Sequence, residues 1–203
     1  SISTLKKNKI IEDNVKVYLM LTDYCVHPLW EAAIDADYIL TPAKNTNEEL
    51  LRKGFKSQQI VPIGYPVASK FKKHIDKKEA CAQLGFSDKF TVMTMSGGFG
   101  MKNEINLVKQ LLPLKEIDLV CICGKNKRNK EKLEKFVARK KLTNVRVMGF
   151  IDNIDVFMSA ADCLVTVGGG VSLTEALYKS IPLIIREKMR INSKLNADFF
   201  VKS

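Results

Sequence analysis

The sequence lacks any long hydrophobic run, although hydrophobic residues make up 46% of its 203 positions. No apolar stretch approaches the roughly 20 residues that a bilayer-spanning helix needs, so we expect no transmembrane segment. Residues 1–9 are polar and basic and therefore do not supply the apolar core of a signal peptide. Histidine is scarce as well, since His27 and His74 are the only two, and no cluster of metal ligands accompanies them. The sequence thus favours a globular protein without a bound metal ion.

The five cysteines form an odd set with no framework of disulfide spacings. Residues 119–124 are typical of a buried strand, in which alternation places the thiols of Cys121 and Cys123 on one face. A metal site there would need further ligands nearby, and the sequence shows none. We therefore expect buried, reduced thiols, as in a cytosolic protein.

The net charge is +11, and lysine is spread along the whole chain rather than gathered in a tail. Such an excess favours anionic partners, among them nucleic acids, phosphorylated ligands and anionic membrane surfaces. A protein from a lysine-rich proteome would have the same composition, so both interpretations stay open. Basic residues are not interleaved with aromatic side chains that could stack on bases, which argues against a nucleic-acid partner.

Short apolar segments alternate with helix-like segments along the chain, which predicts an α/β fold with a Rossmann-like parallel sheet. The expected strands are 15–22, 37–41, 59–63, 90–95, 118–123, 145–150, 162–167 and 182–186. The expected helices are 45–54, 77–84, 103–112, 130–140, 152–159, a helix ending at 179, and 193–201. Ligands of such sheets bind at the carboxyl ends of the strands.

The most informative segment is 162–177, where an apolar strand runs into three glycines and then into a helix. Glycines at such a turn let backbone N–H groups approach a ligand closely, and the helix N-terminus favours an anion such as a phosphate. Ser172 and Thr174 lie near the helix start, and Glu175 is a candidate acceptor for hydroxyl groups of the same ligand. The same turn also occurs where a helix simply packs close to a sheet, so the motif alone leaves both explanations open.

Two further segments follow expected strands and should reach the same edge of the sheet. Gly97, Gly98 and Gly100 follow the strand at 90–95, and Gly149-Phe150-Ile151 follows the one at 145–150. This convergence indicates a ligand site more strongly than any single motif does.

In these segments the chain resembles family 28 glycosyltransferases, which are GT-B enzymes with two Rossmann-like domains. It is most similar in pattern to monogalactosyldiacylglycerol synthases and processive diacylglycerol glucosyltransferases, and more distantly to the peptidoglycan enzyme that adds N-acetylglucosamine to lipid I. The resemblance is carried by residues 22–30, 61–67, 97–100, 123–126, 149–153 and 168–177. It implies that residues 1–66 are a fragment of the N-terminal acceptor domain. Residues 67–203 would then form the C-terminal nucleotide-sugar-binding domain, truncated at its end.

The resemblance implies roles for individual residues. Backbone around Phe150 and Ile151 would hold the uracil of a UDP-sugar. Gly97, Gly98 and Gly100 would line the inter-domain cleft near the phosphates. At the helix start, Gly169, Gly170 and Ser172 would take the diphosphate, and Glu175 would accept from the ribose hydroxyls.

The chain also departs from the family pattern. Val167 stands where the family commonly has a lysine, which removes a cation near the diphosphate. Residues 190–194 correspond to the family segment that contacts the transferred sugar, but they lack its glycine, glutamine and acidic residue. In this segment the resemblance implies a donor-binding role only for Asn192. We expect the catalytic base to lie in a part of the N-terminal domain that this chain does not include. His27 and Asp23 are candidate cleft residues for which a structural role is equally open.

The implied function is transfer of a hexose from a UDP-sugar to a diacylglycerol-type lipid by a hexosyltransferase. The implied location is cytoplasmic, peripheral at the inner face of the cell membrane, where an anionic surface is a further partner. The donor is a substrate, and no separate cofactor is expected. The fragment alone is expected to be inactive. Two alternatives stay open: a non-catalytic nucleotide or anionic-lipid binding protein, and a UDP-GlcNAc-type transferase or epimerase of the same fold.

Overall fold

The computed structural model describes residues 4–5, 8–12, 14–95, 104–186 and 191–202. The chain divides into two compact units. Unit 1 combines Ser1–Pro66 with Arg190–Ser203, and unit 2 is Val67–Met189. The grouping of 190–203 with unit 1 differs from the predicted domain 67–203. Within the described residues, no helix is long and apolar enough to cross a bilayer.

Unit 1 contains a three-stranded parallel sheet in the order β1-β2-β3. Its elements are β1 (Tyr18–Met20), the 3-10 helix η1 (Pro28–Ala33), β2 (Tyr38–Thr41), α2 (Lys44–Arg52), the 3-10 helix η2 (Ser57–Gln59), β3 (Ile60–Pro62) and α9 (Ile191–Lys202). The central strand β2 buries Ile39, which packs with Leu50 of α2 and with Phe55. The predicted strand–helix–strand pattern of this part is thus confirmed, although β1 is shorter than expected.

Helix α9 joins unit 1 through one asparagine and two aromatic side chains. The Asn196 side chain accepts the backbone N–H of Tyr24 at 2.7 Å and donates to Oδ1 of Asp23 at 2.7 Å. Phe199 stacks on the Tyr24 ring with a centroid distance of 4.8 Å, and Phe200 meets the same ring edge-on. These contacts are the physical reason that residues 190–203 group with unit 1 rather than with unit 2.

Unit 2 contains a five-stranded parallel sheet in the order β6-β5-β4-β7-β8. Its strands are β4 (Phe90–Met95), β5 (Ile117–Ile122), β6 (Val145–Met148), β7 (Cys163–Thr166) and β8 (Leu183–Ile185). Its helices are α3 (Ser69–Lys72), α4 (Lys77–Leu84), α5 (Glu104–Leu111), α6 (Lys127–Lys140), α7 (Ile154–Ala160) and α8 (Gly170–Tyr178). The parallel Rossmann-like prediction is confirmed, and the strand order reverses at β4.

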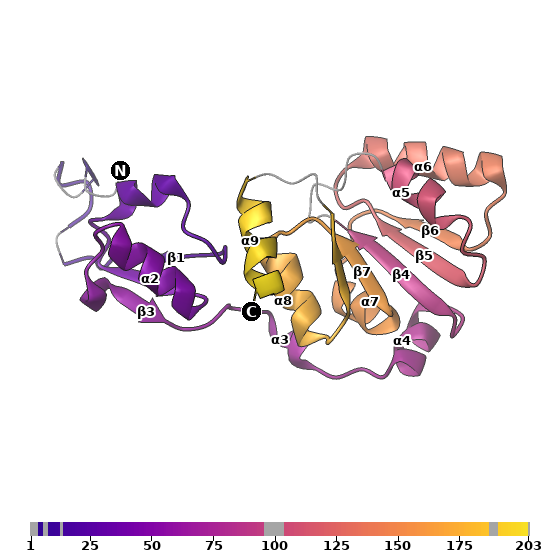
Figure 1. The fold of residues 1–203 in the computed structure, drawn as a ribbon, viewed down its shortest axis with the longest axis horizontal. Coiled ribbons are helices and arrows are strands. Elements are labelled where there is room, and N and C mark those ends of the chain that lie inside the picture. Colours follow the sequence, from indigo (N-terminus) through magenta and orange to yellow (C-terminus); the bar gives the residue numbers. More distant parts are fainter. Residues whose placement is uncertain (1–3, 6–7, 13, 96–103, 187–190, 203) are drawn as a thin grey trace. The chain divides into compact units, whose positions relative to one another are not determined.

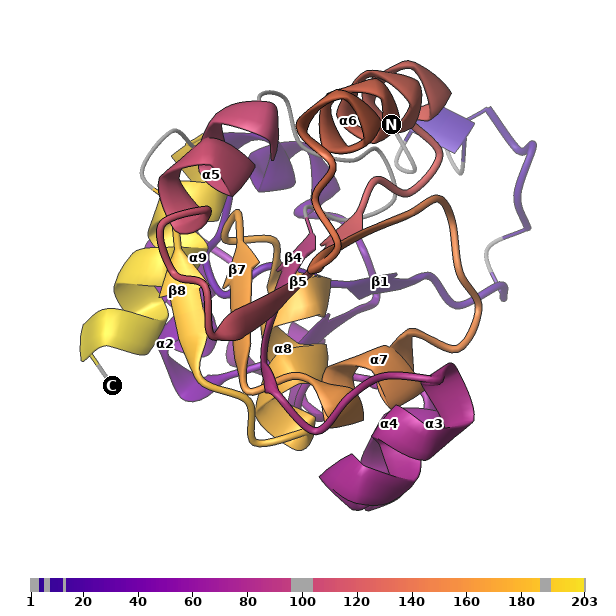
Figure 2. The same cartoon turned by 90° about the vertical axis from the view of Figure 1, so that its right-hand side faces the viewer.

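Helices cover both faces of this sheet (Figures 1 and 2). On one face, Leu119, Cys121 and Cys123 pack with residues of α5 and α6, including Leu133. On the other, Val120 packs with residues of α3, α7 and α8. The alternation along β5 confirms that Cys121 and Cys123 share a face, and burial raises the pKa of the Cys121 thiol to about 12. All five cysteines are buried free thiols.

The helix boundaries follow from capping residues. Asp76 accepts the N–H of Lys78 at the start of α4, which ends at Gly85 with φ +63°. Asn126 accepts the N–H of Asn129 at 3.0 Å, so α6 begins at Lys127 rather than at the predicted residue 130. The sequence prediction placed the start too late because it overlooked this cap.

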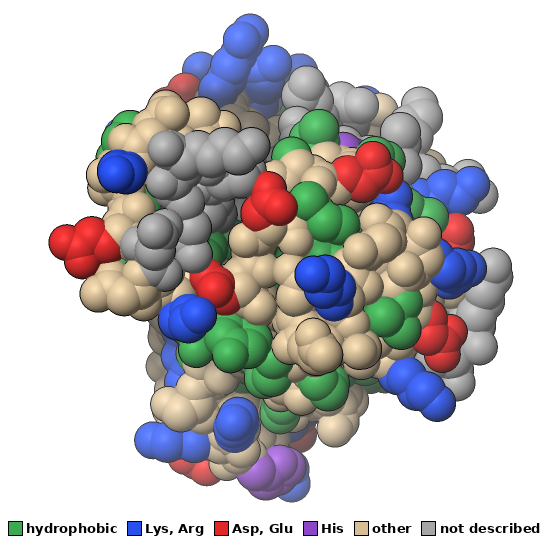
Figure 3. Space-filling model, turned by 90° about the vertical axis from the view of Figure 1, so that its left-hand side faces the viewer, with side chains coloured by type: hydrophobic (Ala, Val, Ile, Leu, Met, Phe, Trp, Pro, Cys, Tyr) green, Lys and Arg blue, Asp and Glu red, His purple; other side chains and the backbone are tan. Residues whose placement is uncertain are grey.

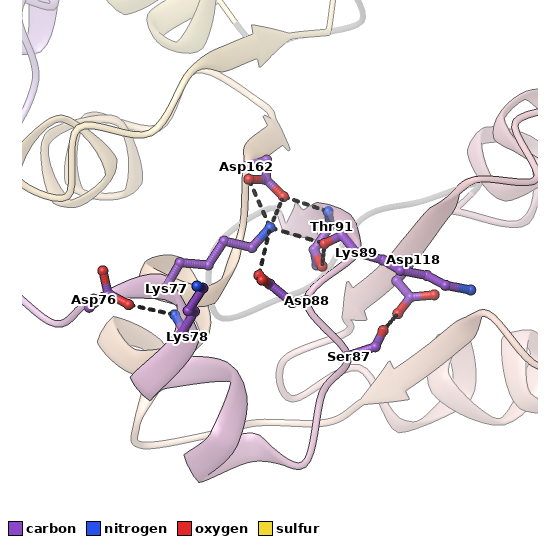
Figure 4. Close-up of polar contacts among 9 residues, drawn as sticks. All are labelled: Asp76, Lys77, Lys78, Ser87, Asp88, Lys89, Thr91, Asp118 and Asp162. Carbon is purple, nitrogen blue, oxygen red and sulfur yellow. Dashed lines mark hydrogen bonds and ion pairs between the residues drawn. The ribbon is translucent and has the colours of Figure 1, made fainter.

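An ion pair ties the amino ends of two strands to α4 (Figure 4). The Lys77 ammonium lies 2.8 and 3.0 Å from the two carboxylate oxygens of Asp162, directly before β7. Asp162 also accepts the N–H of Thr91 in β4 at 2.7 Å. On the face in Figure 3, many Lys and Arg side chains lie among acidic and apolar ones.

Helix α6 ends on a residue in an unfavourable conformation, which gives a stability prediction. Lys141 has φ +50° and its N–H bonds the Ala138 carbonyl, a left-handed cap for which glycine is the preferred residue. We expect Lys141→Gly to raise the free energy of unfolding by about 0.5–1 kcal/mol in urea denaturation. The control Lys140→Gly removes the same charge inside the helix and should lower it by a similar amount. Equal destabilisation by both variants would contradict the cap.

Candidate functional site

The carboxyl ends of all five parallel strands meet at one edge of unit 2. The segment after β5 is 123–126, the one after β6 is 149–153, and the one after β7 is 167–169. The edge includes the point between β4 and β7 where the strand order reverses, which is where ligands of open α/β sheets bind. Gly97, Gly98 and Gly100, predicted to take part, lie outside the described residues.

The turn after β7 leaves a helix N-terminus without a side-chain cap. Helix α8 begins at Gly170, and its N-cap residue Gly169 makes no side-chain cap. The N-termini of α4 and α6, in contrast, are capped by Asp76 and Asn126. The start of α8 therefore presents backbone N–H groups that Gly169 does not cap, together with the positive end of a helix dipole, which suits an anion.

The protein itself does not require a glycine at position 169. Its φ of −77° is open to any residue, and a Cβ there would meet the Val167 carbonyl oxygen at 3.6 Å, an ordinary contact. Gly169 also donates its N–H to that carbonyl. Backbone strain therefore does not explain the glycine at this position.

Two other residues predicted at this turn have different surroundings. Ser172 is buried in the first turn of α8. The neighbouring Thr174 hydroxyl donates back to the Gly170 carbonyl at 2.7 Å, so it serves the helix.

Glu175 is half-buried on α8, about 7 Å along the helix from its start. Burial raises its pKa to about 7, and the positive charge of Lys70 opposes that rise. Lys70 in turn donates to the Asp152 carbonyl and lies 3.7 Å from Oδ1 of Asp155. A carboxyl group with a pKa of about 7 is partly ionised at physiological pH and can accept hydrogen bonds from hydroxyl groups.

Phe150 is an exposed aromatic residue at the same edge. Its side chain is 58% exposed, and the Lys125 ammonium lies 5.4 Å from the ring centroid. Ile151 is half-buried against the core on the α7 face, which holds the backbone of this segment in place. An exposed ring beside a cation provides a platform for a planar group and for nearby negative charge.

A buried carboxyl group that was not predicted from the sequence lies next to this edge. Glu104, the first residue of α5, is completely buried and accepts hydrogen bonds from the Cys123 thiol at 3.1 Å and from Asn129. Burial raises its pKa, while the two hydrogen bonds and the charge of Arg186 oppose the rise. Its neighbouring Cys123 thiol also has a raised pKa, mainly from burial. The network joins α5, the end of β5 and α6. In the sequence, the one indication of it was an acidic residue shortly after a glycine-rich segment.

The remaining predicted residues lie in unit 1. The His27 Nδ1 atom accepts the N–H of Leu29 at 3.2 Å and caps η1, and Asp23 is bonded to Asn196. Asn192 belongs to α9. Unit 2 thus contains Phe150, Ile151, Gly169, Gly170, Ser172 and Glu175, whereas His27, Asp23 and Asn192 belong to unit 1. Among the described residues, no group of three or more His, Cys, Asp or Glu side chains could hold a metal ion.

Comparisons with known proteins agree with the resemblance seen in the sequence. Residues 91–202 match the model of the glycosyltransferase family 28 C-terminal domain, and residues 1–67 match that of monogalactosyldiacylglycerol (MGDG) synthase. The processive diacylglycerol beta-glucosyltransferase of Bacillus licheniformis is 31% identical over 189 residues, 92% of this chain and 49% of that protein. Its namesake in Bacillus mycoides is 27% identical over 210 residues, 100% of this chain and 52% of that protein. The chain therefore spans about half the length of these curated relatives.

Solved structures show the same fold at low identity. Anabaena Alr3699/HepE, in complex with UDP and glucose, has a TM-score of 0.55 at 16% identity, over 84% of this chain and 52% of its own. MurG of Acinetobacter baumannii has a TM-score of 0.58 at 16% identity, over 93% of this chain and 51% of its own. These structures confirm the predicted fold class, the parallel α/β architecture of GT-B glycosyltransferases.

The raised pKa of Glu175 predicts a pH-dependent stability. Because the pKa is about 7 in the folded chain and 4.5 ordinarily, the folded state holds a proton that the unfolded state has lost between these values. The associated stabilisation is complete below the ordinary pKa and disappears as pH rises through about 7. We expect Glu175→Gln to flatten this part of the profile, as measured by urea unfolding between about pH 5 and 8. Glu131→Gln, exposed on α6, should keep the wild-type slope. Equal slopes in all three proteins would refute the assignment.

Proposed function

The chain belongs to glycosyltransferase family 28, and on that premise we propose that the carboxyl edge of its five-stranded sheet binds the nucleotide of a UDP-sugar. The observation that carries the proposal is the uncapped start of α8, placed behind a glycine whose side-chain space the fold leaves open. Two phosphate groups would accept hydrogen bonds from the free N–H groups there, within the field of the helix dipole.

The same arrangement would assist the loss of UDP from the sugar. Negative charge grows on the diphosphate as the bond to the sugar breaks, and fixed N–H donors stabilise that charge without rearrangement. Val167 supplies no cation beside the turn, and its side chain packs against the core on the α5 face. Within the turn itself, the helix terminus would provide this stabilisation.

The nucleoside would extend from the turn toward two other residues of the edge. Glu175 would accept hydrogen bonds from the ribose hydroxyls, and the backbone at Phe150 and Ile151 would bind the uracil. The exposed Phe150 ring, with Lys125 beside it, supports a planar base at this end.

For the whole protein we propose transfer of a hexose from the UDP-sugar to a diacylglycerol-type lipid at the cytosolic face of the membrane. The names of the Bacillus relatives and the match of residues 1–67 support the lipid acceptor. The chain spans about half of those relatives, so the catalytic base and most of the acceptor site would come from the remaining part of the domain pair. When the hexose passes to the acceptor hydroxyl, UDP is the leaving group, and no separate cofactor takes part.

A pair of glycine variants separates ligand binding from folding. Gly169→Ala should leave the melting temperature unchanged, because its φ is negative and the added Cβ makes an ordinary contact. It should weaken UDP binding about tenfold or more in titration calorimetry, because the methyl group occupies the approach to the diphosphate. The matched variant Gly85→Ala, at φ +63° in the cap of α4, should lower stability by about 1 kcal/mol and leave UDP affinity unchanged. No UDP binding by the wild-type chain, or equal binding by Gly169→Ala, would overturn the proposal.

A donor screen tests the reaction itself. The chain extended to the length of its relatives should transfer sugar from a UDP-hexose to diacylglycerol in lipid vesicles, and Glu175→Ala should lower the rate mainly through a raised KM for the donor. The 203-residue chain alone should show binding without turnover. An extended protein that binds UDP and vesicles but transfers no sugar would instead favour a non-catalytic binding protein.

A further inference from the structure

A cavity lies at the amino edge of the sheet of unit 2, opposite the carboxyl edge described above. It has a volume of about 390 Å³ and is enclosed by the segment after α3, the ends of α7 and α8, and the residues that precede β7 and β8. Its lining includes Lys72, Lys73, His74, Lys77, Tyr178 and Lys179. Since the strands are parallel, this edge collects their amino ends and is separate from the proposed nucleotide edge. A cavity of this size is in the range of small-molecule sites.

The charge of the cavity is positive after its internal pairs are counted. Lys77 is neutralised by Asp162, as Figure 4 shows, with contacts of 2.8 and 3.0 Å. Asp155 acts on Lys179 from outside the lining, but it forms its own ion pair with Lys70 at 3.7 Å. The described residues provide no carboxylate within ion-pair distance of Lys72, Lys73 or Lys179.

Helix ends at this edge offset only part of that charge. Helices α7 and α8 both end at the cavity, and each C-terminus contributes about half a negative charge. Together they correspond to about one lysine, whereas three lysines without a carboxylate partner line the space. An anion in the cavity therefore still meets a net positive potential.

Lys179 shows how an anion would be held. Its ammonium donates to the Lys73 carbonyl at 2.7 Å, which fixes the segment carrying Lys72, Lys73 and His74 against the end of α8. An ammonium has three donors, so two remain for a ligand. The side chain is half-buried, and burial lowers its pKa, opposed by the charge of Asp155. A nearby oxyanion would offset that loss of solvation.

The geometry points to a second oxyanion site in unit 2, in which Lys73 and Lys179, with Lys72 and His74 at its margin, bind the phosphate of a phosphate ester. The volume leaves room for a small organic group on the phosphate. The head group of an anionic phospholipid and a soluble phosphate ester share this chemistry. The site does not depend on nucleotide binding at the carboxyl edge.

The test compares two double variants that remove equal charge. Lys73→Gln/Lys179→Gln alters the cavity, and Lys132→Gln/Lys135→Gln alters exposed positions on α6. We expect the cavity variant to weaken binding of inorganic phosphate about tenfold or more in calorimetry, and the α6 variant to change it less than about twofold. Lys72→Gln/Lys73→Gln, at two exposed positions, serves as a second cavity variant if loss of the Lys179 contact impairs folding. Gly169→Ala, which should obstruct the diphosphate at the carboxyl edge, should not change the phosphate affinity of the cavity, and this separates the two sites.

Vesicle sedimentation distinguishes the two sources of phosphate. Binding to phosphatidylglycerol vesicles that falls in the cavity variants, but not in the α6 variant, identifies an anionic lipid head group, with zwitterionic phosphatidylcholine vesicles as the control of zero net charge. Cavity-dependent binding of inorganic phosphate without a cavity-dependent vesicle effect identifies a soluble ester. Equal losses in the cavity and α6 variants, or unchanged phosphate binding in the cavity variants, would overturn the proposal.

Discussion

Parallel pairing of β4 with β5 on one side and with β7 on the other is the constraint on which unit 2 depends. Val92 lies opposite Leu119 in one neighbour and Cys163 in the other, so the chain must leave the sheet and return at the far side of β4. Right-handed crossovers then place α5 and α6 on one face and α7 and α8 on the other. The turn at 167–169 consequently lies beside the end of β4, at the reversal of strand order.

The same constraint gives the two edges of the sheet opposite electrostatic potentials from the helix dipoles. In a parallel α/β sheet every crossover helix starts at the carboxyl edge and ends at the amino edge, so the helix dipoles all point the same way. The residues at the two edges differ in charge and capping. At the carboxyl edge the chain has an uncapped helix and a half-buried acid, Glu175. At the amino edge it has lysines, of which Lys77 is committed to Asp162 and Lys179 to a backbone carbonyl.

Local patterns explain how much of this was predictable. The strand–helix alternation, the shared face of Cys121 and Cys123 and the glycine turn all depend on residues close in sequence, and each was predicted correctly as structure. The buried network of Glu104 was not recognised, because its partners Cys123 and Asn129 lie on other elements, about 20 residues or more further along the sequence. The cavity around Lys179 was missed for the same reason, since Lys73 and Lys179 are brought together only by the packing of α3 and α8. The attachment of α9 to Tyr24 likewise spans most of the chain.

The return of α9 to unit 1 also sets an order of events during synthesis. Unit 2, residues 67–189, is inserted between β3 and α9, so the ribosome completes it before α9 has emerged. Until then the Asn196 side chain cannot accept the backbone N–H of Tyr24, and the Tyr24 ring has Tyr65 but not Phe199 as a stacking partner. Unit 2 can therefore assemble on the nascent chain before the residues around Tyr24, which are made earlier, reach their final packing.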